Sequence, residues 1–315
     1  MPSLKEIKSR VESVNSTLKI TSAMKMVAAA KLHKVQNAIG NMLPYENMLH
    51  SMLENLISCK LASDKSGTSS GVSQSVGGEA ALDDEMEVLC TQRPVRKVAI
   101  VAYSSNSSLC GGFNSSAVRH AMSVVDEYLA NGLDASDITV YSVGRKMADA
   151  MKKKGFVSPA DYTELAEKHE YEDASRLAAE LVHGYMTGRF DKVELVYNHF
   201  KSTSSQPPVR EVYLPLSIMS EKPDGKAENA AAGDYIIEPD VDSLLEDLLP
   251  KVLMLKMYTT QLDTNAAEHA ARTVAMQTAT DNGNDILQEL TLEYNKGRQQ
   301  KITSEILDIV GGAMQ

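Results

Sequence analysis

Apolar residues recur along the first part of the chain at alternating intervals of three and four residues. Ten of the twelve positions in this register between Leu4 and Met42 are apolar. Three leucines continue the register beyond Pro44: Leu49, Leu53 and Leu56. A sustained 3-4 spacing is typical of a coiled coil rather than of the broader apolar face of a globular helix. A helix over residues 3–57 would be about 80 Å long, so we expect it to project beyond a compact domain.

The pattern changes in the middle of the chain, where short apolar runs alternate with amphipathic helical segments. Strands are predicted at residues 96–103, 137–144 and 192–201, and a further strand at 209–216 completes a hairpin. Strands that alternate with helices indicate a mostly parallel α/β layer, here finished by an antiparallel edge. We therefore expect a central, mostly parallel Rossmann-like domain.

Helical periodicity returns from Val241 to Ala313, with a restart or kink expected at Pro250. The part after this proline would be about 95 Å long. Two helices too long for one domain thus lie at opposite ends of the sequence, and each offers the nearest partner for the apolar seam of the other. Because the inserted domain joins them at one end, the predicted fold is α/β plus a long antiparallel α-helical coiled coil formed by the N- and C-terminal helices.

These patterns divide the chain into a shaft, a domain and two loops. Residues 1–60 and 240–315 form the predicted coiled-coil shaft, and residues 95–220 form the α/β domain. Residues 61–94 are polar and rich in glycine and serine, which predicts a flexible loop. Residues 221–239 are predicted as a second loop.

Charge is distributed unevenly along the chain. The net charge is −10, but residues 1–34 carry seven basic and two acidic side chains, a net charge of +5. A basic helix on an acidic protein is suited to nucleic acid, anionic lipid or an acidic protein surface, and charge alone does not choose among them. The N-terminus lacks the features of a leader peptide, so we expect the protein to remain in the compartment of its synthesis.

No catalytic, cofactor-binding or metal-binding constellation is expected. The three cysteines are odd in number and have no C-x-x-C spacing, and His169-Glu170 lacks the second histidine of a zinc-protease motif. The turn at Cys110–Asn114 follows a strand, as phosphate-binding turns do, but it matches neither the dinucleotide nor the P-loop pattern. A tight strand-to-helix turn, with Asn114 or Ser115 as N-cap, is favoured over a nucleotide site.

Polar residues interrupt the seam in both terminal helices. Thr21 and Lys25 interrupt it in the first helix, and residues 295–301 interrupt the apolar stripe in the last. If Gly311 lies opposite Lys8, antiparallel pairing brings both interruptions to one level of the shaft. They then either fix the register of the coiled coil or face an external, hydrogen-bonding partner.

Several long motifs, in order along nearly the whole chain, resemble the gamma subunits of F-type ATP synthases. They are Ser3–Arg10, Ile20–Leu32, Leu109–Asn114, Tyr197–Ser202, Glu268–Arg272 and Leu290–Ala313. The chain differs from this family at Ser105–Ser108, where the family usually has an aspartate and a basic residue. A charged role for this loop is therefore not expected.

The resemblance implies the central rotor of a proton-translocating ATP synthase, which couples ion-driven rotation of the membrane c-ring to ATP synthesis at the beta-subunit sites. It implies a non-catalytic chain inside a ring of three alpha and three beta subunits, in contact with the epsilon subunit and the c-ring. It also implies a peripheral position on the cytoplasmic face of the bacterial inner membrane. The family's beta-subunit contacts match Met24, Lys25, Arg298, Gln299 and Thr303. The alternative is a coiled-coil adaptor or chaperone that only tethers its partners.

Overall fold

The computed structural model describes residues 3–65, 88–89, 91–168, 170–216, 238 and 240–313. The loops predicted at 61–94 and 221–239 lie mostly outside these residues. Among the helices so described, none combines the length and the apolar character needed to cross a membrane.

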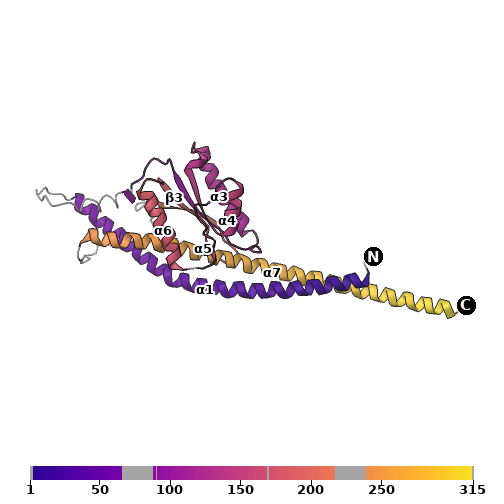
Figure 1. Ribbon diagram of the computed structural model, residues 1–315. Helices are drawn as coiled ribbons and strands as arrows, with labels where there is room; N and C mark the ends of the chain where they lie inside the picture. Colours follow the sequence, from indigo (N-terminus) through magenta and orange to yellow (C-terminus); the bar gives the residue numbers. More distant parts are fainter. Residues whose placement is uncertain are drawn as a thin grey trace, which may run out of the picture.

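Two long helices form a shaft, and an α/β domain lies along one side of it (Figure 1). Helix α1 spans Leu4–Lys65 and helix α7 spans Val241–Ala313, continuing through Pro250. A capping box begins α1: the backbone N–H of Ser3 donates to Glu6 Oε2 at 2.9 Å, and that of Glu6 donates to Ser3 Oγ at 3.3 Å. Local sequence therefore determines where α1 starts.

Burial confirms the 3-4 seam predicted for α1. All of its predicted positions from Leu4 to Leu56 are buried or half-buried, whereas most of the side chains between them are exposed. Beside the domain, five side chains of the two helices form a buried cluster: Leu32, Val35, Leu262, Ala266 and Ala270. Small alanines on α7 let the two helices approach closely beside the α/β domain. Toward the N-terminus the seam is mostly half-buried, because only two helices meet there.

The two helices run antiparallel, as predicted, but in a different register. Thr280 Oγ1 donates to Thr21 Oγ1 at 3.0 Å, Gly283 packs on Leu18, and Gly297 packs on Leu4. The expected pairing of Gly311 with Lys8 is wrong. That pairing would place Gly297 beside position 23. Its observed neighbour, Leu4, is nineteen residues from position 23, or about 28 Å along α1. Since Gly297 already lies beside Leu4, α7 continues alone past the end of α1 (Figure 1).

The central domain contains one mixed sheet, in agreement with the prediction. Its strands are β1 (Val98–Tyr103), β2 (Ile138–Val143), β3 (Lys192–Asn198) and β4 (Pro208–Leu214). The strand order is β2-β1-β3-β4. β1 pairs in parallel with β2 and β3, and β4 pairs antiparallel to β3.

Helices cover both faces of the sheet. They are α3 (Phe113–Ala130), α4 (Arg145–Lys153), α5 (Thr163–Glu167) and α6 (Tyr171–Met186). Ile100 of β1 lies in a core formed with α3 and α4, and its neighbour Val101 lies in a core formed with α6 and α7. Alternate residues of a strand point to opposite faces, so β1 is buried along its whole length. The shaft helix α7 is thus part of the domain's own hydrophobic core.

Candidate functional site

Helix α7 crosses the carboxyl ends of the central strands. The chain leaves β1 toward β2 on one side and later returns to β3 on the other, so the strand order reverses between β1 and β3. In doubly wound sheets this reversal opens a crevice in which ligands bind. Here Tyr103, at the end of β1, donates its hydroxyl to Met257 Sδ at 2.9 Å. Asp263 accepts from the backbone N–H of Phe200 at 2.9 Å and lies 2.7 Å from His199 Nδ1. Side chains of α7 therefore occupy the position that a ligand takes in other such folds.

The Gly-Gly turn after β1 is built as a tight turn that packs on α7. Leu109 and Gly111 have positive φ values of 68° and 59°, and Cys110 is buried against Phe113 and Ala267. The prediction of Asn114 or Ser115 as N-cap is wrong, because Gly112 takes that position without a side-chain bond. The reason is that Asn114 turns back into the loop. Its Oδ1 accepts from the Ser105 backbone N–H at 3.0 Å, and its Nδ2 lies 3.1 Å from Cys110 Sγ.

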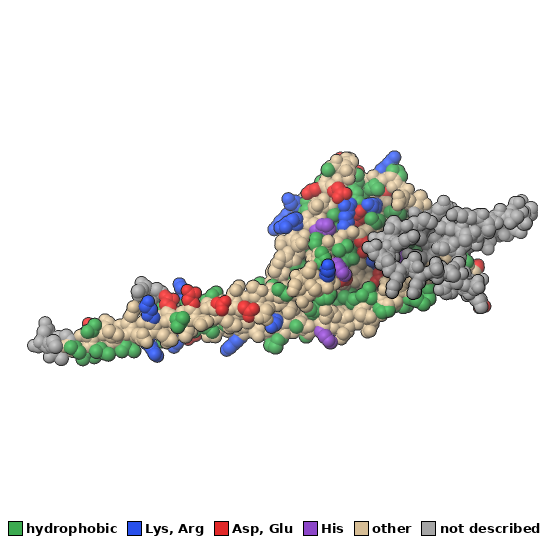
Figure 2. Space-filling model, turned by 180° about the vertical axis from the view of Figure 1, so that it is seen from behind, with side chains coloured by type: hydrophobic (Ala, Val, Ile, Leu, Met, Phe, Trp, Pro, Cys, Tyr) green, Lys and Arg blue, Asp and Glu red, His purple; other side chains and the backbone are tan. Residues whose placement is uncertain are grey.

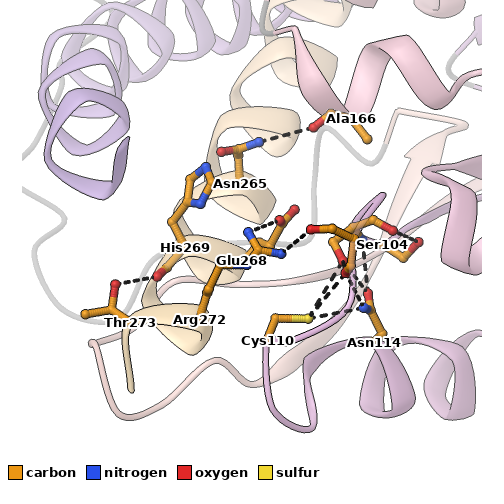
Figure 3. A network of polar contacts seen from close by, with 11 residues as sticks. Ser104, Cys110, Asn114, Ala166, Asn265, Glu268, His269, Arg272 and Thr273 are labelled. Carbon is orange, nitrogen blue, oxygen red and sulfur yellow. Dashed lines mark hydrogen bonds and ion pairs between the residues drawn. The ribbon is translucent and has the colours of Figure 1, made fainter. Parts of the chain in front are cut away.

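A buried ion pair on α7 is tied to the same loop (Figure 3). Arg272 Nη1 donates to Glu268 Oε1 at 2.6 Å, and Arg272 Nη2 donates to Ser107 Oγ at 2.7 Å. Both charged side chains are only 10% exposed. Burial raises the pKa of Glu268, although Arg272 and the nearby Lys31 oppose this shift. Ser105–Ser108 carries no charged residue of its own, so Arg272 of α7 brings charge to this loop.

Sequence reasoning did not identify this ion pair. Glu268 and Arg272 are four residues apart on a helix, a spacing that signals an ion pair. The contact with Ser107 carried no such signal, since 165 positions separate the two residues.

Two amides of α7 hold the short helix α5. Gln261 Nε2 donates to the carbonyl oxygens of Leu165 and Lys168, the latter at 3.1 Å. Asn265 Nδ2 donates to the carbonyl oxygen of Ala166 at 3.4 Å (Figure 3). The last carbonyls of a helix have no partner within it, so these amides act as a C-terminal cap from a distant element.

The structure separates the five predicted contact residues into two groups. Met24 and Lys25 are half-buried and lie in the paired part of the shaft, close to the Thr21–Thr280 contact. Arg298, Gln299 and Thr303 are exposed and lie beyond the contact of Gly297 with Leu4. The expectation that both polar interruptions lie at one level is therefore wrong. The reason is the shifted register.

Large apolar side chains are exposed along the shaft, outside the seam. On α1 they include Ile20 at 60%, Met26 at 65% and Val27 at 58% exposure. On α7 they are Val274, Ile286, Leu292, Ile302, Ile306, Leu307, Ile309 and Val310. Figure 2 shows such side chains along the narrow end of the molecule. Contiguous exposed apolar surface marks an interaction site, so this part of the shaft is the candidate partner-binding surface.

Basic side chains accompany this surface. Of the seven basic residues in positions 1–34, Lys25 is half-buried and the other six are exposed. Among the described residues no cluster of three or more histidine, cysteine, aspartate or glutamate side chains is arranged to hold a metal ion. The exposed surface of α1 over residues 4–34 is therefore apolar and cationic, whereas α7 beyond residue 280 also exposes carboxylates such as Asp281, Glu289 and Glu293 (Figure 2).

Comparisons with known proteins agree on one family. A family model described as ATP synthase matches residues 3–314. The ATP synthase gamma chain of Phocaeicola vulgatus is 49% identical over 315 residues, covering both chains completely. That of Flavobacterium johnsoniae is 39% identical over 313 residues, covering 99% of this chain and 98% of the relative.

Solved structures share the fold. A chain of the Euglena gracilis mitochondrial ATP synthase has a TM-score of 0.57 at 19% identity, with 99% of this chain and 93% of that chain covered. A chain from the central stalk and c-ring of the Tetrahymena thermophila mitochondrial ATP synthase has a TM-score of 0.52 at 21% identity, with 82% and 99% covered.

Proposed function

The chain belongs to the ATP synthase gamma chain family, and from this we propose that it is the central rotor of a bacterial F-type ATP synthase. The observation that carries the proposal is the shaft itself. Antiparallel helices extend away from the α/β domain, and α7 continues alone with exposed apolar side chains. An apolar surface at the end of a long shaft is stable in water when another protein encloses it.

The enclosing partner is a ring of three alpha and three beta subunits. Met24 and Lys25 contact this ring along the paired shaft, and Arg298, Gln299 and Thr303 contact it along the single helix. Because Met24 and Lys25 lie in the paired part and the other three residues lie beyond Leu4, the ring is held at two levels. The exposed basic side chains of α1 favour acidic segments of the ring.

Coupling follows from the asymmetry of the shaft. One shaft inside three equivalent beta subunits presents a different surface to each, so their conformational equilibria differ. Shifting one site from 1:99 to 99:1 requires about 5.5 kcal/mol of differential binding free energy. A few hydrogen bonds to charged groups, at about 1.5–3 kcal/mol each, are sufficient when they are remade at every third of a turn.

The chain itself is non-catalytic in this proposal. Helix α7 occupies most of its switch-point crevice, with Asp263 and Arg272 bonded to the loops that would otherwise surround a ligand. ATP chemistry therefore takes place on the beta subunits. At the other end of the shaft, the c-ring and the epsilon subunit bind the chain, which keeps it peripheral at the cytoplasmic face of the inner membrane.

Reconstitution tests the proposal against the adaptor alternative. The full chain is mixed with purified alpha and beta subunits, and ATPase activity and rotation of a probe on the α/β domain are measured. A rotor yields a closed ring whose ATPase activity is accompanied by rotation. A ring with equal activity in the absence of the chain, or with an immobile probe, would support a tether instead.

A further inference from the structure

A small cavity remains where α7, α5 and the end of β1 meet. It has a volume of about 10 Å³ for the centre of a water-sized probe. Six of its seven lining residues carry a side-chain oxygen, among them Ser104, Gln261, Thr264, Asn265 and Glu268, although carbon atoms make up most of the lining surface. It lies at the carboxyl end of β1, in the part of the switch-point crevice that α7 does not fill. Figure 3 shows Asn265 and Glu268 on α7 and Ser104 on the segment that follows β1.

One lining residue, Gln261, carries a buried acceptor with no partner among the described residues. Gln261 is 2% exposed, and its Nε2 is used by the carbonyl oxygens of α5. Its Oε1 is buried and accepts no hydrogen bond within the described part of the chain. The amide cannot be reversed to remove the problem, because its Nε2 would then lose both carbonyl acceptors. A buried acceptor of this kind is normally satisfied by protein or by an ordered water.

Other lining groups keep capacity for a further hydrogen bond. Thr264 Oγ1 donates to the carbonyl oxygen of Thr260 at 2.9 Å, which leaves its lone pairs available. Glu268 uses Oε1 for Arg272, and a carboxylate accepts several hydrogen bonds. A small donor in the cavity therefore has acceptors on more than one side.

We propose that this cavity binds one water molecule, which donates one hydrogen bond to Gln261 Oε1 and a second to Thr264 Oγ1. The volume corresponds to about one water, and Gln261 Oε1 and Thr264 Oγ1 supply the polar partners that a buried water needs. A metal cation fits less well. The only carboxylate in the lining is already neutralised by Arg272, and six to eight oxygen ligands, as calcium requires, exceed what one water-sized space admits. The water is part of the joint that holds the shaft in the α/β domain.

A matched pair of variants tests the site. Thr264→Val and Thr273→Val each remove a hydroxyl that donates to the carbonyl four residues earlier on α7, at 2.9 and 2.8 Å respectively. Only Thr264 lines the cavity. The assembled complex of each variant and of the wild type is imaged at a resolution that shows buried waters elsewhere in the map.

The wild type and Thr273→Val should show a peak about 2.6–3.2 Å from Gln261 Oε1, and the peak height should fall at least twofold in Thr264→Val. A wild-type map without the peak would overturn the proposal. So would a peak surrounded by five or more oxygens at metal–ligand distances, or an unchanged peak in Thr264→Val. The result does not depend on rotation, so it separates this inference from the rotor function.

Discussion

At the scale of single residues, the domain is organised around a buried carboxylate on β3. Glu194 is 1% exposed and accepts hydrogen bonds from Arg210 Nε at 2.8 Å and from the hydroxyl of Tyr128 at 2.8 Å. Lys192 Nζ lies 2.7 Å away. Burial alone would raise the pKa of Glu194, but the hydrogen bonds from Arg210, Lys192 and Tyr128 outweigh burial and lower it. The charged form is therefore stabilised by folding.

We predict an acid-dependent loss of stability from this group. Because the pKa of Glu194 is lower in the folded state, its contribution to stability is complete above pH 4.5, the ordinary pKa of this side chain. It is lost as the pH falls through the lowered pKa. Urea unfolding as a function of pH checks this. Glu194→Gln should reduce the free energy of unfolding by about 2 kcal/mol at neutral pH and flatten this part of the acid limb. An acid limb identical to that of the wild type would contradict the assignment.

Gly144 supports the end of β2 by a close backbone approach. Its φ is 100°, and a Cβ at this position would collide with the carbonyl oxygen of Ser104. Gly155 has a similar φ of 94° but no atom within 4 Å of the same position. A side chain at Gly155 would therefore cause backbone strain alone, whereas one at Gly144 would cause strain and a steric collision.

Alanine at these two positions should have unequal effects. Gly155→Ala should lower the free energy of unfolding by about 1–2 kcal/mol, the cost of a left-handed backbone. Gly144→Ala should lower it by more than about 3 kcal/mol, since the backbone of β1 must also move. Thermal unfolding of the purified chains measures both. Equal losses would mean that the collision is relieved without cost.

At the scale of elements, the sequence predicts periodicity well and register poorly. The 3-4 spacing identified the buried face of α1 because each seam position is apolar or lies between apolar turns. Because the seam is apolar along its whole length, several registers of α1 against α7 would bury similar amounts of apolar surface. The choice depends on single sites such as Gly283 and Gly297, where α1 leucines approach the α7 backbone. Aligning the ends of the two helices missed these sites.

Tertiary contacts also explain the elements that sequence reasoning did not find. Helix α5 has five residues, too few for a periodic signal, and amides of Gln261 and Asn265 hold its C-terminal end. The partners lie more than ninety positions apart. The strands were predicted because short apolar runs separated by helices are a local signal. The contacts between α7 and the loops at the ends of the strands were not predicted, because no local signal indicates them.

Leucine at Gly283 should destabilise the shaft. A Cβ there would lie 2.7 Å from Leu18 Cδ2, so a larger side chain forces the helices apart. We expect Gly283→Leu to lower the free energy of unfolding by about 1–3 kcal/mol. Gly40 is also helical and has nothing within 4 Å, so Gly40→Leu should instead stabilise by about 0.5–1 kcal/mol. Helicity monitored by circular dichroism during thermal unfolding compares the two, and stabilisation by both would contradict the observed register.

At the scale of the whole molecule, the proposed partner contacts can be separated from assembly. The double variant Arg298→Ala with Gln299→Ala removes two exposed side chains from the part of α7 beyond Leu4. We expect it to lower coupled ATP synthesis several-fold and to leave the yield of assembled complex nearly unchanged. The proposal assigns coupling to hydrogen bonds that are remade during rotation, and it assigns assembly to the apolar surface. Synthesis by membrane vesicles and recovery of purified complex measure the two quantities.

A control for this variant lies on α4. Lys152→Ala with Lys153→Ala also removes two exposed side chains, but from the α/β domain. It should leave both synthesis and assembly at wild-type levels if the effect is specific to the single helix. Normal synthesis in the Arg298 and Gln299 variant would remove these residues from the coupling surface.

The unequal ends of the two helices affect how the molecule responds to twisting. Residues 301–310 lie beyond the contact of Gly297 with Leu4, and all are exposed. A lone helix about 10–12 Å across resists torsion less than a pair that packs side by side. Elastic deformation under load is therefore concentrated at this tip, whereas the paired part turns almost as a rigid rod with the α/β domain. A fluorescent label near residue 305 should lag in angle behind one on α4 whenever the tip is held back, and the lag measures the energy stored between successive steps.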